Sequence, residues 1–164
     1  MAGFNQVGWD AMRHELALGM LNVALFAQAT AQQSMGNAGG PVPHQSSPPG
    51  GPPEVQTGNL RRSLHAVAYL DGQLVGGSGT DSNGKAVPDY ASEAGSGIVA
   101  IAGTNCGYGL WVEIGTSGKP NGLTSLETGE PMLTGGMAAR PSLAPAAAEA
   151  QSRAGELIAA VKHG

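Results

Sequence analysis

The sequence predicts an α+β domain: a small mixed or antiparallel sheet packed by a long N-terminal helix and a C-terminal helix, with a long Pro/Gly-rich loop or arm. Three observations predict this class. Apolar residues recur at steps of three and four near both ends of the chain, as in helices that bury one face. Short alternating or apolar runs in the middle have the pattern of strands. The length of 164 residues corresponds to a single domain, residues 1–164.

The first helix is expected from about Trp9 to Gln33. Its apolar residues at helical spacing are Trp9, Met12, Leu16, Met20, Val23, Ala27 and Thr30. Leu18, Leu21 and Leu25 widen this stripe. The helix is therefore expected to bury two faces, one against its own sheet and the other against a neighbouring subunit. Such a helix spans roughly 37 Å.

A Pro/Gly-rich segment follows at residues 36–56 and shows no hydrophobic periodicity. Its prolines exclude a helix or a central strand, so it is either a disordered linker or an arm that orders on assembly. It leads directly into TGNLRRSL, in which Thr57 is expected to cap a short helix through Ser63. Arg61 and Arg62 of this helix allow three interpretations: a phosphate contact, a solvated or salt-bridging face, or a pair with an acid on a neighbouring subunit.

The middle of the chain has strand patterns. Residues 65–70 alternate and are followed by an Asp-Gly pair, typical of a type I′ turn, so residues 73–77 are the expected return strand. Residues 80–96 are loop-like. Residues 97–103 (GIVAIAG) are almost entirely apolar and are expected as a central strand covered on both faces.

Two further helices are expected toward the C-terminus. The first runs from Asn105 to Gly115, with apolar residues on adjoining faces and Gly115 as its stop. Residues 116–136 are expected as a loop, and a short extended piece is expected at 137–140. Ser142 begins the last helix, whose first turn tolerates a proline. Its apolar stripe consists of Leu143, Ala147, Ala150, Ala154, Leu157 and Val161.

The composition predicts a thin core. The chain has 27 Gly and 11 Pro, but only 2 Phe, 2 Trp and 3 Tyr. Much of its apolar content is alanine, which buries little area per residue. A lone subunit is therefore expected to be marginally stable, and assembly with copies of itself would supply the missing buried surface.

Charge and sequence patterns exclude several classes of function. The formal net charge of −4 argues against non-specific nucleic-acid binding, which needs Lys and Arg to displace counterions. The single cysteine, Cys106, is expected to be a small buried hydrophobe, and the four histidines are scattered, so neither a metal nor a cofactor is expected. The start of the chain does not have the pattern of a signal peptide, and the apolar run 17–29 is too short to span a membrane, which predicts a cytosolic chain.

Two patterns could indicate catalysis, and neither is complete. GTDSNGKA at 79–86 nearly matches a phosphate-binding loop, but Ala86 stands where a magnesium-binding hydroxyl residue is required. The same residues are typical of a turn. Ser63, His65 and Asp71 could form a hydrolase triad, but they lack the context of a nucleophile elbow. No catalytic residue is therefore assigned.

Three segments, PPEVQTGNLRRSL (52–64), YGLWVEIGTS (108–117) and MAARPSLAPAAAEA (137–150), occur in an order that resembles the head–tail joining proteins of long-tailed bacteriophages. This family includes neck, connector, tail-completion and minor tail proteins. The resemblance covers about two-thirds of the chain, and each segment alone is weak. The chain departs from the family pattern at Ser142, where an aromatic such as Phe is usual, and at Gly109, where Ala is frequent.

The resemblance implies a virion protein without enzymatic activity, made in the host bacterial cytoplasm. Its copies would form a hexameric or dodecameric ring in the neck, enclosing DNA without sequence-specific binding or membrane contact. Its partners would be portal-side head-closure or adaptor proteins and tail-terminator or tail-tube proteins. The candidate interface or structural residues are Thr57, Gly58, Leu60, Arg61, Arg62, Trp111, Glu113, Gly115, Thr116, Arg140 and Pro141. The alternatives are a tail-terminator ring and, from another class, a small phosphate- or nucleotide-binding enzyme built on GTDSNGKA.

Overall fold

The computed structural model describes residues 5–35, 58–77, 80–115, 119–124, 131–134 and 141–163. Its elements are α1 (Gln6–Ser34), α2 (Asn59–Ser63), β1 (Leu64–Leu70), β2 (Gln73–Gly77), α3 (Ala91–Ala94), β3 (Ile98–Thr104), α4 (Gly109–Ile114), β4 (Lys119–Thr124), β5 (Pro131–Thr134), α5 (Leu143–Ser152), α6 (Ala154–Ala159) and a 3-10 turn (Ala160–His163). The predicted α+β class is confirmed in its long N-terminal helix, small antiparallel sheet and C-terminal helices. The predicted arm at 36–56 and the extended piece at 137–140 lie outside the described residues.

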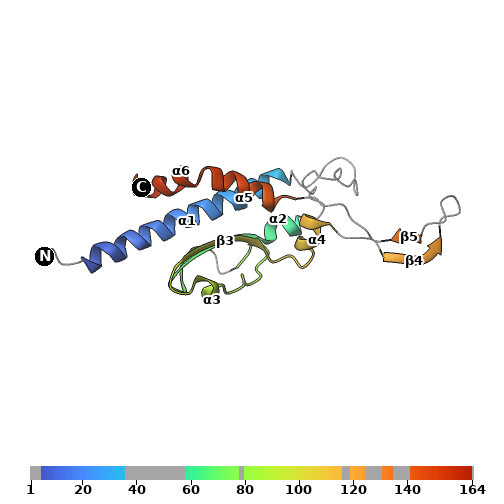
Figure 1. The fold of residues 1–164 in the computed structure, drawn as a ribbon, viewed down its shortest axis with the longest axis horizontal. Coiled ribbons are helices and arrows are strands. Elements are labelled where there is room, and N and C mark those ends of the chain that lie inside the picture. The colour runs from blue at the N-terminus through green and yellow to red at the C-terminus, as the bar shows by residue number, and fades with distance from the viewer. Residues whose placement is uncertain are drawn as a thin grey trace.

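Helix α1 is the middle of three layers, between the sheet and the C-terminal helices (Figure 1). It begins at Asn5, whose Oδ1 accepts a hydrogen bond from the Gly8 amide at 3.2 Å. Its buried residues are mostly small: Ala17, Gly19, Leu21, Ala24, Ala27 and Ala31. The sequence predicted a neighbouring subunit against the second buried face. Helices α5 and α6 of the same chain pack on this second face, while Trp9, Met12 and Leu16 near the start of α1 stay partly exposed.

The main sheet has the strand order β2-β1-β3, and both pairings are antiparallel. The predicted β1–β2 hairpin is confirmed. Asp71 and Gly72 at its turn have φ angles of 51° and 76°, as a type I′ turn requires. Strand β1 is buried along almost its whole length because it pairs on both sides and lies against α1.

Strand β3 is not the central strand that its apolar sequence predicted. Among the described residues it pairs only with β1, from Leu64↔Thr104 to Leu70↔Ile98. An apolar run indicates that neither face of a strand is solvated, but it does not indicate how many strands flank it. One face of β3 lies on α1, and Val99 and Ile101 on the other face pack against Val67 and Tyr69. All of its residues are half-buried.

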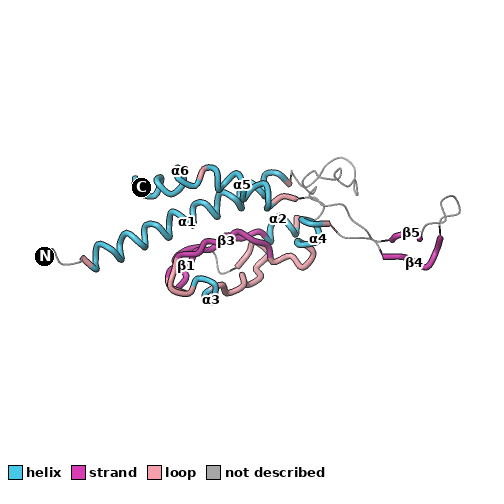
Figure 2. The backbone as a smooth tube through the Cα atoms, in the orientation of Figure 1, coloured by secondary structure: helices cyan, strands magenta, loops and turns pink. Residues whose placement is uncertain are grey.

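Two parts of the chain differ from the predicted loops. A single turn of helix, α3, interrupts residues 80–96, and Ala94 at its end is buried against the sheet. Residues 116–136 contain an antiparallel hairpin, β4–β5, paired from Lys119↔Thr134 to Thr124↔Pro131. This hairpin lies apart from the three layers, on the side of the molecule where α4 is found (Figure 2). The sequence did not predict it because its strands lack the alternation that burial against a core imposes.

The C-terminal helix was predicted to be continuous but is divided at Arg153 into α5 and α6. The Arg153 guanidinium lies 4.7 Å from the centre of the Phe26 ring on α1, a cation–π contact at the break. The buried residues of α5 are Ala146 and Ala150, so Ala147 of the predicted stripe is exposed.

Two glycine substitutions test this packing. A Cβ at Gly19 would lie 2.9 Å from Cγ2 and 3.1 Å from Cα of Ile158, so α6 must move away from α1. Gly19→Ala is expected to lower the free energy of unfolding by about 1–3 kcal/mol. Gly155 lies on α6 with open space around it. Gly155→Ala is therefore expected to raise the free energy of unfolding by about 0.5 kcal/mol. Urea unfolding measures both, and equal effects would contradict the packing.

Candidate functional site

Helix α2, which contains Leu60, Arg61 and Arg62, joins the three layers. It begins at Gly58, which has φ 72° and whose carbonyl accepts from the Arg62 amide at 2.9 Å. The predicted cap at Thr57 is therefore wrong: Gly58 is the cap, because a residue without Cβ adopts this left-handed conformation at no steric cost. Thr57 itself lies outside the described residues.

Side chains of α1 hold α2 and the start of β1 in place. Gln32 donates to the Arg61 carbonyl at 3.2 Å, and Gln28 donates to the Leu64 carbonyl at 2.9 Å. Leu60 packs against the buried cluster of Ala31, Met35, Leu64 and Ala146, which comes from α1, β1 and α5. Helix α2 and the start of β1 are thus where these elements meet.

Ser63 ties α2 to the end of β3. Its hydroxyl lies 2.6 Å from both the Leu60 carbonyl and the Thr104 hydroxyl. Gly109 at the start of α4 lies against the same place, since a Cβ there would be 2.5 Å from Thr104 Cγ2 and 3.4 Å from Leu60. Because a Cβ at this position would overlap Thr104, the close approach favours glycine here.

The loop GTDSNGKA is described from Thr80 and docks onto α2. Arg62 Nε donates to Asn83 Oδ1 at 2.9 Å, and the Ser82 amide donates to the Arg62 carbonyl at 3.0 Å. The Asp81 carboxylate accepts from the amides of Asn83 at 2.8 Å and Lys85 at 3.0 Å. Burial alone would raise the pKa of Asp81, but these donors lower it overall. A carboxylate therefore occupies amides that a phosphate-binding loop would direct at its ligand.

Glu113 on α4 binds the N-terminus of α5. Its Oε1 accepts from the Ser142 amide at 2.8 Å, the Ser142 hydroxyl at 2.7 Å and the Leu143 amide at 2.7 Å. A negative charge is favoured there by the helix dipole and by the unpaired amides of the first turn. The Ser142 hydroxyl supplies one of these bonds. Glu113 thus links the second and third segments of the resemblance.

The other candidate residues are dispersed. Gly115, with φ 74°, ends α4, and Pro141 is half-buried next to Ser142. Thr116 and Arg140 lie outside the described residues. Trp111 is half exposed and contributes to a surface that we call the α4 ridge: Leu110, Trp111 and Ile114, which are 59%, 50% and 63% exposed.

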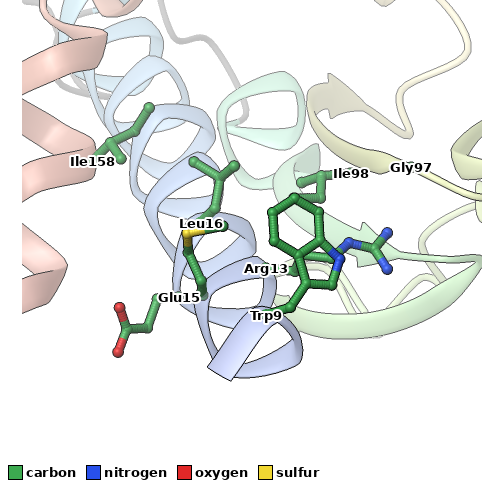
Figure 3. Close-up of a pocket in the computed structure, with 8 residues that line it drawn as sticks. Trp9, Arg13, Glu15, Leu16, Gly97, Ile98 and Ile158 are labelled. Atoms are coloured by element: carbon green, nitrogen blue, oxygen red, sulfur yellow. The ribbon is translucent and has the colours of Figure 1, made fainter. Parts of the chain in front are cut away.

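A second apolar surface lies at the N-terminal end of α1, away from the α4 ridge. We call it the α1 groove; it has a volume of about 470 Å³, and its apolar lining residues are Trp9, Met12, Leu16, Ile98 and Ile158. Figure 3 shows that it lies where α1, β3 and α6 come together. The sequence stripe included Trp9, Met12 and Leu16 but gave no signal for the residues of β3 and α6 that complete the groove.

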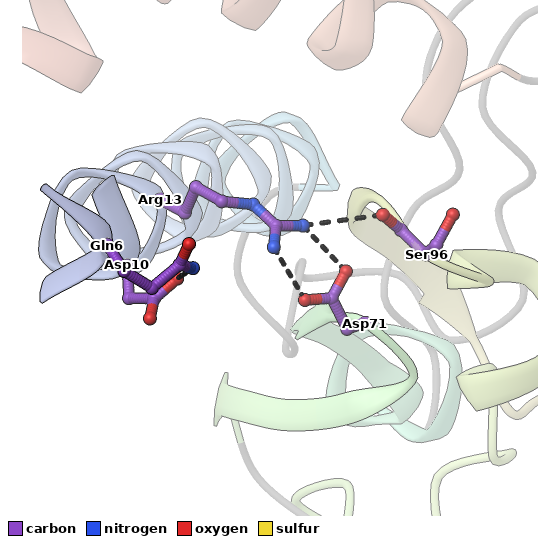
Figure 4. A network of polar contacts seen from close by, with 5 residues as sticks. All are labelled: Gln6, Asp10, Arg13, Asp71 and Ser96. Atoms are coloured by element: carbon purple, nitrogen blue, oxygen red, sulfur yellow. Dashed lines mark hydrogen bonds and ion pairs between the residues drawn. The ribbon is translucent and has the colours of Figure 1, made fainter. Parts of the chain in front are cut away.

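An ion pair fixes the end of the sheet beside this groove. Arg13 on α1 donates to both carboxylate oxygens of Asp71, at 2.8 and 2.6 Å, and to the Ser96 carbonyl at 3.3 Å (Figure 4). The hydrogen bond with Asp71 raises the pKa of Arg13. Sequence reasoning used Asp71 only for the turn and for a hydrolase triad, so it missed this contact between residues 58 positions apart.

The structure does not assemble the Ser63, His65 and Asp71 triad. Ser63 bonds to Leu60 and Thr104, whereas Asp71 pairs with Arg13 beyond the far end of β1. His65 Nδ1 lies 3.3 Å from the Ser63 carbonyl, and its ring stacks on Tyr90. Its Nε2 is buried without a hydrogen-bond partner among the described residues. Within the described ranges no group of three His, Cys, Asp or Glu residues is placed to hold a metal ion. Nor is any of the described helices long and apolar enough to cross a membrane.

Comparisons with protein-family models, with curated proteins and with solved structures gave no match.

Removing the Glu113 carboxylate is expected to loosen α5. Glu113→Ala leaves the amides of Ser142 and Leu143 without their acceptor and is expected to lower the free energy of unfolding by about 2 kcal/mol. Glu113→Gln keeps one acceptor oxygen, so roughly half that loss is expected. Glu149→Gln, on the exposed face of α5, is the matched control. Chemical unfolding gives all three values, and a Glu113→Ala protein as stable as this control would contradict the capping role.

Protonation of His65 is expected to destabilise the fold in mild acid. Burial lowers the pKa of His65 below 6.5, against smaller opposite effects of the Ser63 carbonyl and Asp81. The unfolded chain then binds more protons than the folded chain as the pH falls below about 6.5, so stability decreases with acidification there. Asp81, whose pKa is below 3.8, acts only at lower pH.

The measurement is the free energy of unfolding at about pH 7.5 and about pH 5.5, on either side of the range in which histidine titrates. In His65→Gln, the free energy of unfolding should fall much less between the two pH values than in wild type. In His14→Gln, a change on the exposed surface of α1, it should fall as in wild type. An unchanged pH dependence in His65→Gln would contradict the assignment.

Proposed function

We propose that this protein is a structural component of a tailed-bacteriophage virion, without enzymatic activity, whose copies form a ring in the neck and join the DNA-filled head to the tail. The observation that carries the proposal is the α4 ridge. Leu110, Trp111 and Ile114 expose half or more of their apolar side chains, and they belong to one of the three segments that resemble head–tail joining proteins. Exposed apolar clusters of this kind are typical of protein–protein contacts.

The packing of the three segments on one another supports the proposal. Leu60 of the first lies against Gly109 of the second, and Glu113 of the second binds Ser142 and Leu143 of the third. Segments far apart in the sequence therefore build one end of the molecule. A shared order of motifs has more weight when the motifs also make a common structure.

The charge also fits a protein that surrounds DNA without gripping it. A net charge of −4 gives no net attraction to phosphates, so DNA could pass through the ring without being held. The proposed partners are a portal-side head-closure or adaptor protein on one side and a tail-terminator or tail-tube protein on the other. In this proposal the protein is made in the host bacterial cytoplasm and ends in the virion.

The test is genetic and structural. Cells infected with phage that lack this protein are expected to accumulate DNA-filled heads and separate tails, as seen in electron micrographs. Adding purified wild-type protein to an extract of these cells should restore joined particles. Joined, infectious particles made without the protein would contradict the proposal. Adding the protein separately to tailless heads and to isolated tails identifies which it binds first. Binding to tails alone would indicate a tail-terminator ring instead.

A matched variant separates this proposal from the phosphate-binding alternative. Lys85→Ala removes the lysine on which a nucleotide-binding loop depends and is expected to restore joining as well as wild type does. Loss of joining in Lys85→Ala, together with nucleotide binding by the wild-type protein, would favour the alternative.

A further inference from the structure

The loop at residues 80–86 contains an Asn-Gly pair, Asn83–Gly84, and the sequence has a second such pair at Asn121–Gly122. In an Asn-Gly pair the asparagine side chain is readily lost as ammonia, because glycine has no side chain to hinder attack by its own amide nitrogen. The same pair is common in tight turns. Which of the two properties matters at Asn83 therefore depends on the contacts of this loop.

Deamidation of Asn83 requires only base and water. The Gly84 amide nitrogen attacks Cγ of Asn83, so that a new C–N bond closes a cyclic imide and the Cγ–Nδ2 bond breaks. The side-chain nitrogen leaves as ammonia and takes up the proton that the Gly84 amide loses. Water then opens the imide at either carbonyl and leaves aspartate or isoaspartate. No electrons are transferred in either step.

Hydrogen bonds hold both reacting groups of this pair. Asn83 Oδ1 accepts from Arg62 Nε at 2.9 Å, and Asn83 Nδ2 donates to the Asn59 carbonyl at 3.1 Å, so both ends of the side-chain amide are bound to α2. The Gly84 amide donates to the Asp81 carbonyl at 2.9 Å. A side chain bound to α2 cannot turn toward the Gly84 nitrogen, and a hydrogen-bonded amide loses its proton less readily.

Water and base nevertheless reach the pair. A Cβ built on Gly84 would meet no atom within 4 Å, and both Gly84 and Lys85 are exposed. Burial therefore does not protect Asn83, and its protection depends on the docking of the loop on α2. Apart from the two side-chain bonds of Asn83, this docking includes the bond from the Ser82 amide to the Arg62 carbonyl at 3.0 Å. A surface loop held by a few such bonds opens more readily than the whole chain unfolds.

We propose that Asn83 is a deamidation site controlled by α2. The side chain stays an amide while the loop is docked, and it is converted to aspartate or isoaspartate when the loop leaves α2. Ammonia is lost to solvent, so the change is one-way. This site is independent of the proposed function, because its chemistry involves only this chain and water.

Both products oppose renewed docking of the loop. Aspartate places a carboxylate oxygen, which cannot donate, against the Asn59 carbonyl where Nδ2 now donates. Its ion pair with Arg62 would lie near the surface and compensate little. Isoaspartate lengthens the main chain of the turn and shifts Gly84 and Lys85 away from Asp81, whose carboxylate now binds the Lys85 amide at 3.0 Å.

Peptide mapping by mass spectrometry, in mildly alkaline buffer with and without urea, measures the reaction. In urea, Asn83 is expected to deamidate about as fast as Asn121, since both are then Asn-Gly pairs in an unfolded chain. Without urea, the rate at Asn83 is expected to fall about ten-fold or more, which corresponds to an opening free energy of at least about 1.4 kcal/mol. Equal rates at Asn83 in the two conditions would overturn the proposal.

A matched pair of variants tests the role of α2. Arg62→Ala removes the donor to Asn83 Oδ1 and is expected to deamidate several-fold faster than wild type without urea. Ser82→Ala keeps the bonds of Asn83 and Gly84, and is expected to react as wild type does. Arg62→Ala reacting no faster than Ser82→Ala would overturn the control by α2. If the melting temperature shows that Arg62→Ala is unfolded during the incubation, the comparison of wild type with and without urea decides.

Asn83→Asp tests what the modification does. This variant copies one product and is expected to speed hydrogen exchange at the Ser82 amide, which is bound to the Arg62 carbonyl while the loop is docked. Exchange as slow as in wild type would contradict the claim that deamidation releases the loop.

Discussion

Helix α1 is buried on two sides, by the sheet on one and by α5 and α6 on the other, and the rest of the structure depends on this packing. Alanines and Gly19 on its buried faces let three layers approach closely, but they fill the core with little side-chain volume. Among the residues that the structure describes, the largest fully buried side chains are Leu64, Val67 and Ser63. The core is therefore thin for a chain of this length, and much of its large apolar surface remains outside.

The same packing organises the surface. Gln28 and Gln32 of α1 hold α2, α2 holds α4 through Leu60, and Glu113 on α4 holds α5. At the opposite end Arg13 holds the β1–β2 turn and leaves the α1 groove open beside it. These contacts of α1 leave the α4 ridge exposed at one end of the molecule and the α1 groove exposed at the other. Exposed apolar clusters of this kind are typical of protein–protein contacts.

Much of the fold could be predicted from local patterns, because each pattern reports a local constraint. Local sequence specifies α1 through the spacing of its apolar residues and the hairpin through the Asp71–Gly72 turn. It specifies β1 and β3 through their strand patterns. Strand order, the β4–β5 hairpin and the break at Arg153 depend on neighbours distant in sequence and were missed. The same limit applies to the site. Glu113 was singled out by its motif, but its bonds to Ser142, and the groove assembled from α1, β3 and α6, arise only from tertiary packing.

In the proposed ring, each copy is incompletely packed alone and would be stabilised by the next. Any contact made only by the folded chain raises its stability by mass action. The most direct measurement is the melting temperature over about a hundred-fold range of protein concentration. The account predicts that it rises with concentration, together with the oligomer fraction. A melting temperature that stays constant across the range, with a single-copy species throughout, would contradict it.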